Sequence, residues 1–166
     1  MNKEIKLNLG CGDKILEGWE NYDKTPSDPR VKNIDLNKLP LPFKDNYADY
    51  ILLSHVYEHL DVNHFEFMRE IHRVLKVGGI VEIRVPSCKV SVEHTKHVFL
   101  SKYFDNICRF ENRKENKYID FLFEKVSFER VYRDKYGFLF DVFPFMEKLF
   151  PFMQNVEMIW KLKKIV

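Results

Sequence analysis

Cysteine is scarce in this sequence. The three cysteines, Cys11, Cys88 and Cys108, lie far apart. An odd number at such wide spacing provides neither a disulfide framework nor the paired ligands of a zinc ribbon. We therefore expect a reducing, cytoplasmic setting and no structural metal.

Long apolar runs and an excess of one charge are also missing. No apolar run approaches the length of a membrane-spanning helix, and the first residues lack the apolar stretch of a signal peptide. Lys and Arg number 27 and Asp and Glu number 25, a net charge of +2. That balance gives no electrostatic reason to expect nucleic acid or an anionic membrane as the main partner. The length of 166 residues, 45% of them hydrophobic, suits a single globular domain.

Short strand-like segments follow one another in the first half of the chain. Their residue types and the turn residues that bound them predict strands at 5–9, 19–22, 31–34, 50–53 and 80–85. The segment 50–53 is an unbroken apolar run, which is typical of a strand covered on both faces.

One amphipathic helix separates the last two of these strands. Asp61 or Asn63 can cap its N-terminus, and Asn63 has Glu66 three residues later, while Gly78-Gly79 predicts its end. Its expected apolar face consists of Phe65, Met68, Ile71, Val74 and Leu75. Strands that alternate with helical crossovers predict a mostly parallel sheet. Later in the chain we expect helices at 99–110 and 143–153 and strands at 121–132 and 158–166.

A glycine turn follows the first strand. Gly10-Cys11-Gly12 allows the backbone to approach a ligand without a Cβ in the way, and ligands of parallel sheets bind at this edge. Asp23 and Asp35 follow the next two strands, where carboxylates can accept hydrogen bonds from ribose hydroxyls and a purine amino group. A dinucleotide fingerprint would need a third glycine at Ile15, so a nucleoside without a pyrophosphate fits better.

Several segments together resemble class I S-adenosylmethionine-dependent methyltransferases, closest to the small-molecule type grouped as methyltransferase type 11. The segments are Leu7-Asn8-Leu9-Gly10-Cys11-Gly12, Gly18-Trp19-Glu20-Asn21-Tyr22-Asp23, Asp35-Leu36 with Leu39-Pro40-Leu41-Pro42-Phe43, Ser54 to Leu60, and Leu75 to Ile80. The resemblance implies an α/β fold with a Rossmann-like, mostly parallel seven-stranded sheet and one antiparallel strand. Only about ten residues separate Gly12 from Asp23, so we expect the first crossover helix to be reduced or absent. We expect one domain over residues 1–166, with a cofactor-binding half at 1–87 and the substrate lid and C-terminal strands at 88–166.

The resemblance also implies roles for individual residues toward S-adenosyl-L-methionine. Gly10 and Gly12 would face its methionine part, and Asp23 would hold the ribose hydroxyls. Asp35 and Leu36 would flank the adenine. Ser54 and His55 would lie under the sulfonium. The cofactor-binding set is completed by Cys11 and by Asn8, which stands where the family usually has an acidic residue.

Histidines provide the candidate catalytic groups. His55 and His59 are candidates for substrate contact or for a general base, as is His97 in the region that commonly covers the substrate in this family. For His97, the alternative is a solvated surface pair with His94. The same His55-Val56-Tyr57-Glu58-His59 segment also matches the His-x-x-Glu-His pattern of zinc peptidases. That alternative requires the pattern to lie within a long helix and a third ligand from elsewhere. Glu58 and His59 could also simply orient the turn by hydrogen bonds.

Aromatic residues are frequent near the C-terminus, with seven between Tyr136 and Phe152. We expect most of them to cover one face of the sheet, with a homodimer surface or an apolar substrate pocket as alternatives. The favoured function is methyl transfer to a small-molecule or sugar-like acceptor. The alternatives are a non-catalytic binding or partner subunit with the cofactor fold and, more remotely, a zinc hydrolase.

Overall fold

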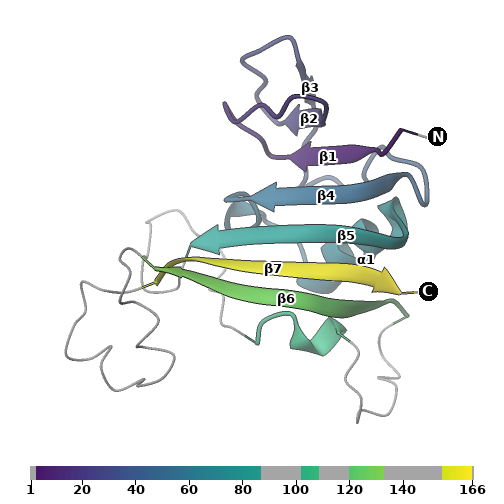
Figure 1. Cartoon of the computed structure of the whole chain (residues 1–166). Coiled ribbons are helices and arrows are strands. Elements are labelled where there is room, and N and C mark those ends of the chain that lie inside the picture. The colour runs from purple at the N-terminus through teal and green to yellow at the C-terminus, as the bar shows by residue number, and fades with distance from the viewer. Residues whose placement is uncertain (1–2, 87–101, 109–119, 133–154, 166) are drawn as a thin grey trace.

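A seven-stranded mixed sheet forms the centre of the molecule (Figure 1). The structure is a computed structural model that describes residues 3–86, 102–108, 120–132 and 155–165. The strands are β1 (Lys6–Leu9), β2 (Glu20–Asp23), β3 (Val31–Asn33), β4 (Ala48–Ser54), β5 (Leu75–Pro86), β6 (Leu122–Tyr132) and β7 (Asn155–Ile165). Their order across the sheet is β3-β2-β1-β4-β5-β7-β6.

The first five strands are parallel, and β7 is antiparallel to both of its neighbours, β5 and β6. The expected α/β, Rossmann-like sheet with one antiparallel strand is therefore confirmed. Because β1 to β5 run in one direction, their carboxyl ends meet at the same edge of the sheet.

No helix connects β1 to β2 in this described part of the chain, as the short spacing predicted. The side chain of Asn21 holds the connection instead. Its Oδ1 accepts hydrogen bonds from Asn8 Nδ2 and Leu16 N, both at 2.9 Å, and its Nδ2 donates to Leu16 O at 2.9 Å. A buried asparagine amide thus satisfies backbone groups that a helix would otherwise satisfy.

The amphipathic helix α1 (His64–Val74) begins where the sequence predicts. Asn63 Oδ1 accepts hydrogen bonds from the backbone N–H groups of Phe65 and Glu66, so it is the N-cap. The predicted end at Gly78-Gly79 is wrong, because the helix ends at Val74 and both glycines lie within β5. Leu75 pairs with Ala48 of β4, and this long-range strand pairing takes the last apolar residue of the pattern out of the helix.

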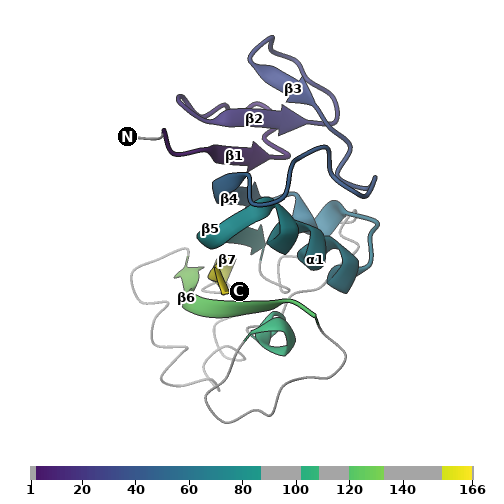
Figure 2. The same ribbon diagram turned by 90° about the vertical axis from the view of Figure 1, so that its right-hand side faces the viewer.

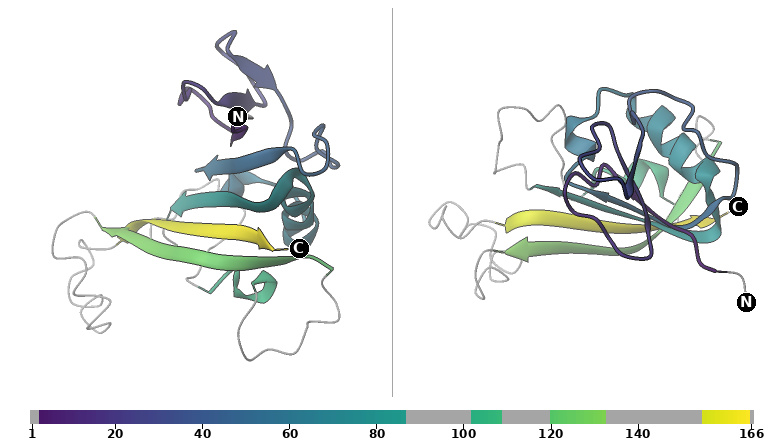
Figure 3. Two further views of the ribbon diagram at one scale, coloured as in Figure 1. Left: turned by 45° about the vertical axis from the view of Figure 1, so that its right-hand side comes forward. Right: turned by 90° about the horizontal axis from the view of Figure 1, so that it is seen from above.

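Helix α1 lies on one face of the sheet, beside β4 and β5 (Figures 2 and 3). The core on this face includes Phe67, Met68 and Ile71 of α1 and Ile51 and Leu53 of β4, all fully buried. Tyr50 and Leu52, which alternate with them on the opposite face, are only half-buried. Within the apolar run 50–53, the side chains that face α1 are therefore more completely buried than those on the opposite face of the sheet.

The predicted helix at 99–110 is also wrong over residues 102–108, where the structure has only the short 3-10 helix η2 (Asp105–Ile107). Phe104 before it is fully buried and packs against Trp160 of β7, with ring centroids 5.2 Å apart. One buried aromatic side chain thus anchors this segment to the sheet without a longer helix. The helix expected at 143–153 and the aromatic region from Tyr136 to Phe152 lie outside the described residues.

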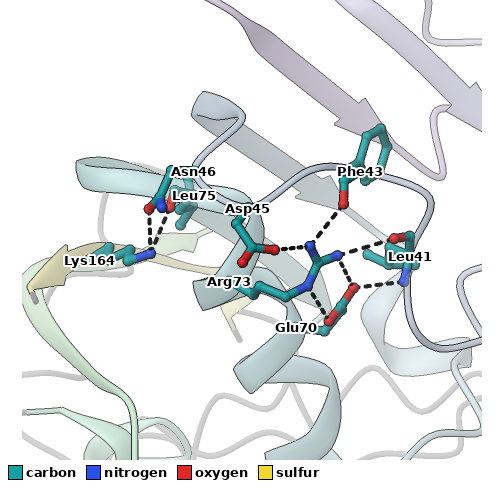
Figure 4. A network of polar contacts seen from close by, with 8 residues as sticks. All are labelled: Leu41, Phe43, Asp45, Asn46, Glu70, Arg73, Leu75 and Lys164. Carbon is teal, nitrogen blue, oxygen red and sulfur yellow. Dashed lines mark hydrogen bonds and ion pairs between the residues drawn. The ribbon is translucent and has the colours of Figure 1, made fainter.

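A polar network ties α1 to the loop before β4 (Figure 4). Arg73 donates hydrogen bonds to Glu70 and Asp45 and to the carbonyl oxygens of Leu41 and Phe43. Glu70 Oε1 in turn accepts from Leu41 N at 2.7 Å.

Lys164 makes a similar link from β7, and its Nζ donates to Asn46 Oδ1 and Leu75 O, both at 2.9 Å. Burial lowers the pKa of Lys164. Ion pairs and hydrogen bonds of Arg73 therefore connect the helix to the loop, and hydrogen bonds of Lys164 connect the last strand to the loop and to Leu75 at the end of the helix.

Candidate functional site

The glycine turn lies at the carboxyl edge of the sheet, directly after β1. Gly10 has a φ of +70° and Gly12 a φ of +50°, in the left-handed region that favours glycine. The N–H groups of Gly10 and Cys11 both donate to Tyr22 O, at 2.8 and 3.0 Å, so the turn is tied to β2. A Cβ at Gly12 would meet no atom within 4 Å. Backbone is therefore exposed to open space at Gly12, as a ligand cradle requires.

Asp23 at the end of β2 lies directly against this turn. Its Oδ2 accepts a hydrogen bond from Gly12 N at 2.8 Å, and its Oδ1 accepts from Thr25 N at 3.0 Å. A carboxylate has about four acceptor positions, so these bonds leave acceptor capacity for ligand hydroxyls. The structure thus brings together two residues, Gly12 and Asp23, that the sequence analysis assigned to one ligand.

Asp35 follows β3 and completes the row of strand-end carboxylates. Lys24 Nζ lies 3.3 Å from Asp35 Oδ2, and Asn37 N donates to Asp35 Oδ1 at 3.1 Å. The hydrogen bond from Asn37 N is the main cause that lowers the pKa of Asp35. The neighbouring Leu36 is buried in the core, with 4% of its surface exposed.

A pocket of about 320 Å³ opens beside the glycine turn. Four predicted cofactor residues line it: Asn8, Gly10, Cys11 and Ser54. The other described residues of the lining, which the sequence did not indicate, are Lys14, Leu16, Trp19, Tyr50, Leu52, Glu82 and Arg84. Strand alternation could have shown that Tyr50, Leu52 and Ser54 share a face, and likewise Glu82 and Arg84. The pairing of the two strands was not readable from the sequence.

Glu82 is the buried charge of this pocket, with 4% of its surface exposed. Tyr50 Oη donates to Glu82 Oε2, Arg84 Nε donates to Glu82 Oε1 at 2.5 Å, and Lys161 Nζ lies 3.6 Å away. Burial would raise the pKa of Glu82, but the hydrogen bonds from Tyr50 and Arg84 outweigh it and lower the pKa. Glu82 is therefore ionised at the pocket floor, and Arg84 and Lys161 beside it balance its negative charge.

His55 follows β4 with a left-handed backbone, φ +55°, which is uncommon for a residue with a Cβ. Its N–H donates to Arg84 O at 2.9 Å, which fixes the backbone at the strand end. Its Nε2 lies 2.8 Å from Glu157 Oε1 of β7, a contact between residues 102 positions apart. Strained residues of this kind cluster at functional sites.

Glu58 lies between the two predicted histidines. Its Oε1 is 3.7 Å from His55 Nδ1 and 3.8 Å from His59 Nε2, and only 2% of its side chain is exposed. Its Oε2 is buried without a hydrogen-bond partner among the described residues. Burial raises the pKa of Glu58, and the nearby His59 and His55 offset this only in part.

The zinc alternative does not match this geometry. His55 lies at a strand end and His59 in the 3-10 helix η1 (Tyr57–His59), so the two imidazoles do not share the face of a long helix. Across the described ranges, no group of three or more His, Cys, Asp or Glu side chains is arranged to hold a metal ion. His97 lies outside the described residues, so its predicted role stays a prediction.

The edge fits a nucleoside cofactor in three respects. Gly12 leaves space for backbone approach, Asp23 keeps acceptor capacity, and a pocket adjoins the turn.

Within the described part of the chain, no helix is long and apolar enough to cross a membrane.

Comparisons with known proteins agree with this assignment. Residues 12–83 match the family model described as a methyltransferase domain. Over 100 residues, the chain is 33% identical to Ribosomal RNA-processing protein 8 of Caenorhabditis elegans. That match covers 55% of this chain and 28% of the relative, so the chain spans well under half of its length.

Two solved structures share the fold at low identity. An S-adenosylmethionine-dependent methyltransferase from Archaeoglobus fulgidus aligns with a TM-score of 0.63 at 17% identity, covering 97% of this chain and 86% of that one. Phosphoethanolamine N-methyltransferase 2 of Haemonchus contortus, in complex with S-adenosyl-L-methionine, aligns with a TM-score of 0.55 at 17% identity. This second match covers 100% of this chain and 50% of that one. The strand order, the glycine turn and the family match over residues 12–83 together support a class I S-adenosylmethionine-dependent methyltransferase, with S-adenosylmethionine as its cofactor.

Proposed function

We propose that this chain transfers a methyl group from S-adenosylmethionine to a small-molecule or sugar-like acceptor. The observation that carries the proposal is the contact of Asp23 with Gly12 at the strand edge, beside a pocket of about 320 Å³. Asp23 accepts the ribose hydroxyls, Asp35 and Leu36 flank the adenine, and Gly10, Cys11 and Gly12 contact the methionine part. When bound, the cofactor supplies an electrophilic methyl group, so the protein mainly aligns the acceptor and excludes water from it.

His55 is the residue we assign to the proton of the acceptor. The carboxylate of Glu157 accepts a hydrogen bond, so the ring nitrogen 2.8 Å from it carries the proton. In the neutral ring this leaves Nδ1 as the basic nitrogen. An acceptor that attacks through a hydroxyl would lose its proton to that nitrogen, whereas a neutral amine or a thiolate can attack without a base. His59, at 47% side-chain exposure, is placed to contact the acceptor from the adjoining turn.

The two parts of the chain have separate tasks in this proposal. Residues 1–87 hold the cofactor, because every predicted cofactor residue lies there. Residues 88–166 supply strands β6 and β7, including Glu157, and the acceptor side of the site. Together they act as one domain, since β7 pairs with β5 of the first part.

Two kinds of observation point to different classes of methyl acceptor, RNA and a small molecule. The name of the Caenorhabditis elegans relative favours an RNA acceptor, although the match covers only 28% of that protein. The net charge of +2 favours a small molecule, because RNA-binding surfaces are usually strongly basic, and a pocket of about 320 Å³ has room for one.

A transfer assay separates these possibilities. The full chain is incubated with S-adenosylmethionine carrying a tritium-labelled methyl group, with either a small-molecule extract or total RNA. We expect label in the small-molecule fraction and loss of that label in His55→Ala. Label in RNA alone would overturn the acceptor class. Cofactor binding without transfer to either pool would favour the non-catalytic partner subunit.

A further inference from the structure

The pocket lies on the side of the sheet away from α1, over the carboxyl halves of β1, β4 and β5. Its floor includes the alternating residues Tyr50, Leu52 and Ser54 of β4 and Arg84 of β5, which pairs with Ser54. No helix lies between β1 and β2, so the loop that contains Lys14 and Trp19 forms one wall. The pocket is therefore lined by loop and strand side chains at a position where a crossover helix would otherwise pack.

Lys14 is held at this wall by its own backbone. Its N–H donates to Cys11 O at 2.9 Å, and its carbonyl oxygen accepts from Asn8 Nδ2 at 2.8 Å. The side chain is exposed and lines the pocket. No carboxylate in the described ranges forms an ion pair with Lys14, so its ammonium group can bind a ligand anion.

Arg84 supplies a second cation to the same pocket. Its Nε and Nη2 contact Glu82 Oε1, both at 2.5 Å, and a guanidinium has five N–H donors. Glu82 also contacts Tyr50 and Lys161, so its negative charge is shared between Arg84 and Lys161. Arg84 therefore keeps part of its positive charge for a ligand. Among the described residues of the lining, Lys14 and Arg84 are positive and only Glu82 is acidic, which leaves an excess of positive charge there.

Asn8 provides the complementary acceptor. Its Nδ2 donates to Lys14 O and Asn21 Oδ1, which leaves Oδ1 to accept from a ligand. A pocket with two cations and one amide oxygen matches a ligand that carries a carboxylate and an ammonium group, as an α-amino acid does.

We propose that Lys14 and Arg84 bind the carboxylate of the cofactor's amino-acid end, with Asn8 Oδ1 accepting from its ammonium group. The inference rests on the proposed function, because it takes the cofactor to bind at Gly10 and Ser54, which line the same pocket. These cations take over the role of aligned helix N–H groups, which the β1–β2 connection lacks. They make the amino-acid end a main determinant of cofactor affinity.

A pair of ligands tests this directly by isothermal titration. S-adenosylhomocysteine carries the amino-acid end, whereas methylthioadenosine is a similar thioether without it. We expect the wild-type chain to bind S-adenosylhomocysteine at least about tenfold more tightly. Lys14→Gln and Arg84→Gln should each weaken S-adenosylhomocysteine by about five- to thirtyfold while changing methylthioadenosine by less than about twofold. Lys44→Gln, an exposed lysine outside the pocket, is the matched control and should change neither affinity.

The outcomes separate this inference from the proposed function. Equal wild-type affinities for the two ligands, or equal weakening of both ligands by Lys14→Gln, would overturn the inference and leave cofactor binding intact. A wild-type chain that binds neither ligand would overturn the proposed function and the inference with it. When Arg84→Gln does not fold, Lys14→Gln carries the test, and Arg84→Lys, which keeps a cation beside Glu82, should retain the preference for S-adenosylhomocysteine.

Discussion

Gly10 and Gly12 share a left-handed backbone but have opposite surroundings. A Cβ at Gly10 would lie 2.3 Å from Val56 Cγ2, whereas one at Gly12 would meet nothing within 4 Å. We predict that Gly10→Ala lowers the free energy of unfolding by about 2–4 kcal/mol, from backbone strain plus overpacking. Gly12→Ala should cost only about 1–2 kcal/mol from backbone strain but should weaken cofactor binding.

Urea unfolding and titration with S-adenosylhomocysteine measure the two effects. Gly12→Val, with a larger side chain in the same open space, should abolish binding while the protein stays folded. Equal stability losses at Gly10 and Gly12 would contradict the overpacking at Gly10. Normal binding by a folded Gly12→Val chain would show that the turn does not cradle a ligand.

Glu58 should make stability depend on pH in an unusual direction. Burial raises the pKa of this carboxyl in the folded state, so above about pH 4.3 the unfolded chain releases the proton first. Stability therefore falls as pH rises from the unfolded pKa toward the raised folded pKa. We predict that Glu58→Gln, which cannot ionise, is more stable than wild type at pH 7 and loses this advantage near pH 4. A variant with the same relative stability at both values would show that Glu58 ionises as easily in the fold as in the unfolded chain.

At the scale of elements, Arg73 links α1 to the loop before β4. Removing its guanidinium leaves Glu70, of which 8% of the surface is exposed, without its ion-pair partner and frees two loop carbonyls. We predict that Arg73→Met lowers the free energy of unfolding by about 2–4 kcal/mol, near the range for breaking a buried pair. Arg30→Met, which breaks an exposed ion pair with Asp28, is the control and should leave the melting temperature almost unchanged. Similar effects of the two variants in thermal unfolding would contradict the structural role of Arg73.

His72 should make the junction of α1 with β6 sensitive to acid. Its ring packs against Phe121 and Phe123, and burial, aided by Lys164, lowers its pKa below 6.5. As pH falls through about 6.5, the unfolded chain takes up a proton before the folded chain does, so stability falls. We predict that His72→Gln removes part of the stability loss between about pH 7 and pH 5, as measured by urea unfolding. An unchanged pH profile would place the acid-sensitive group elsewhere.

Local patterns predicted the elements better than their ends. The helix start was readable because Asn63 acts through its own side chain on neighbouring N–H groups. Its end was not, because Leu75 suits both the helix face and the start of β5, and pairing with Ala48 decides between them. Likewise, Phe104 packs on the distant Trp160 and leaves only a short 3-10 helix where the pattern suggested a longer one.

At the scale of the whole molecule, some residues of the site could be predicted from the sequence and others could not. Gly12 and Asp23 were readable, because each follows its own strand and parallel strands end at one edge. Glu157 was not, because it reaches His55 across 102 residues through the antiparallel insertion of β7 between β5 and β6. Arg84 was missed since its place beside Ser54 depends on strand register.

We propose that S-adenosylmethionine binds at the edge of the sheet where Asp23 contacts Gly12. Isothermal titration of S-adenosylhomocysteine against wild type, Asp23→Asn and Asp23→Ala tests it most directly. Asn can still accept a hydrogen bond from Gly12 N but lacks the charge, so it separates turn geometry from ligand binding. Asp28→Ala, a half-buried aspartate in the following loop, is the control. We predict that both Asp23 variants weaken binding by about 1–3 kcal/mol and that the control does not. Unchanged affinity in folded Asp23 variants, or no binding by the wild-type chain, would contradict the account.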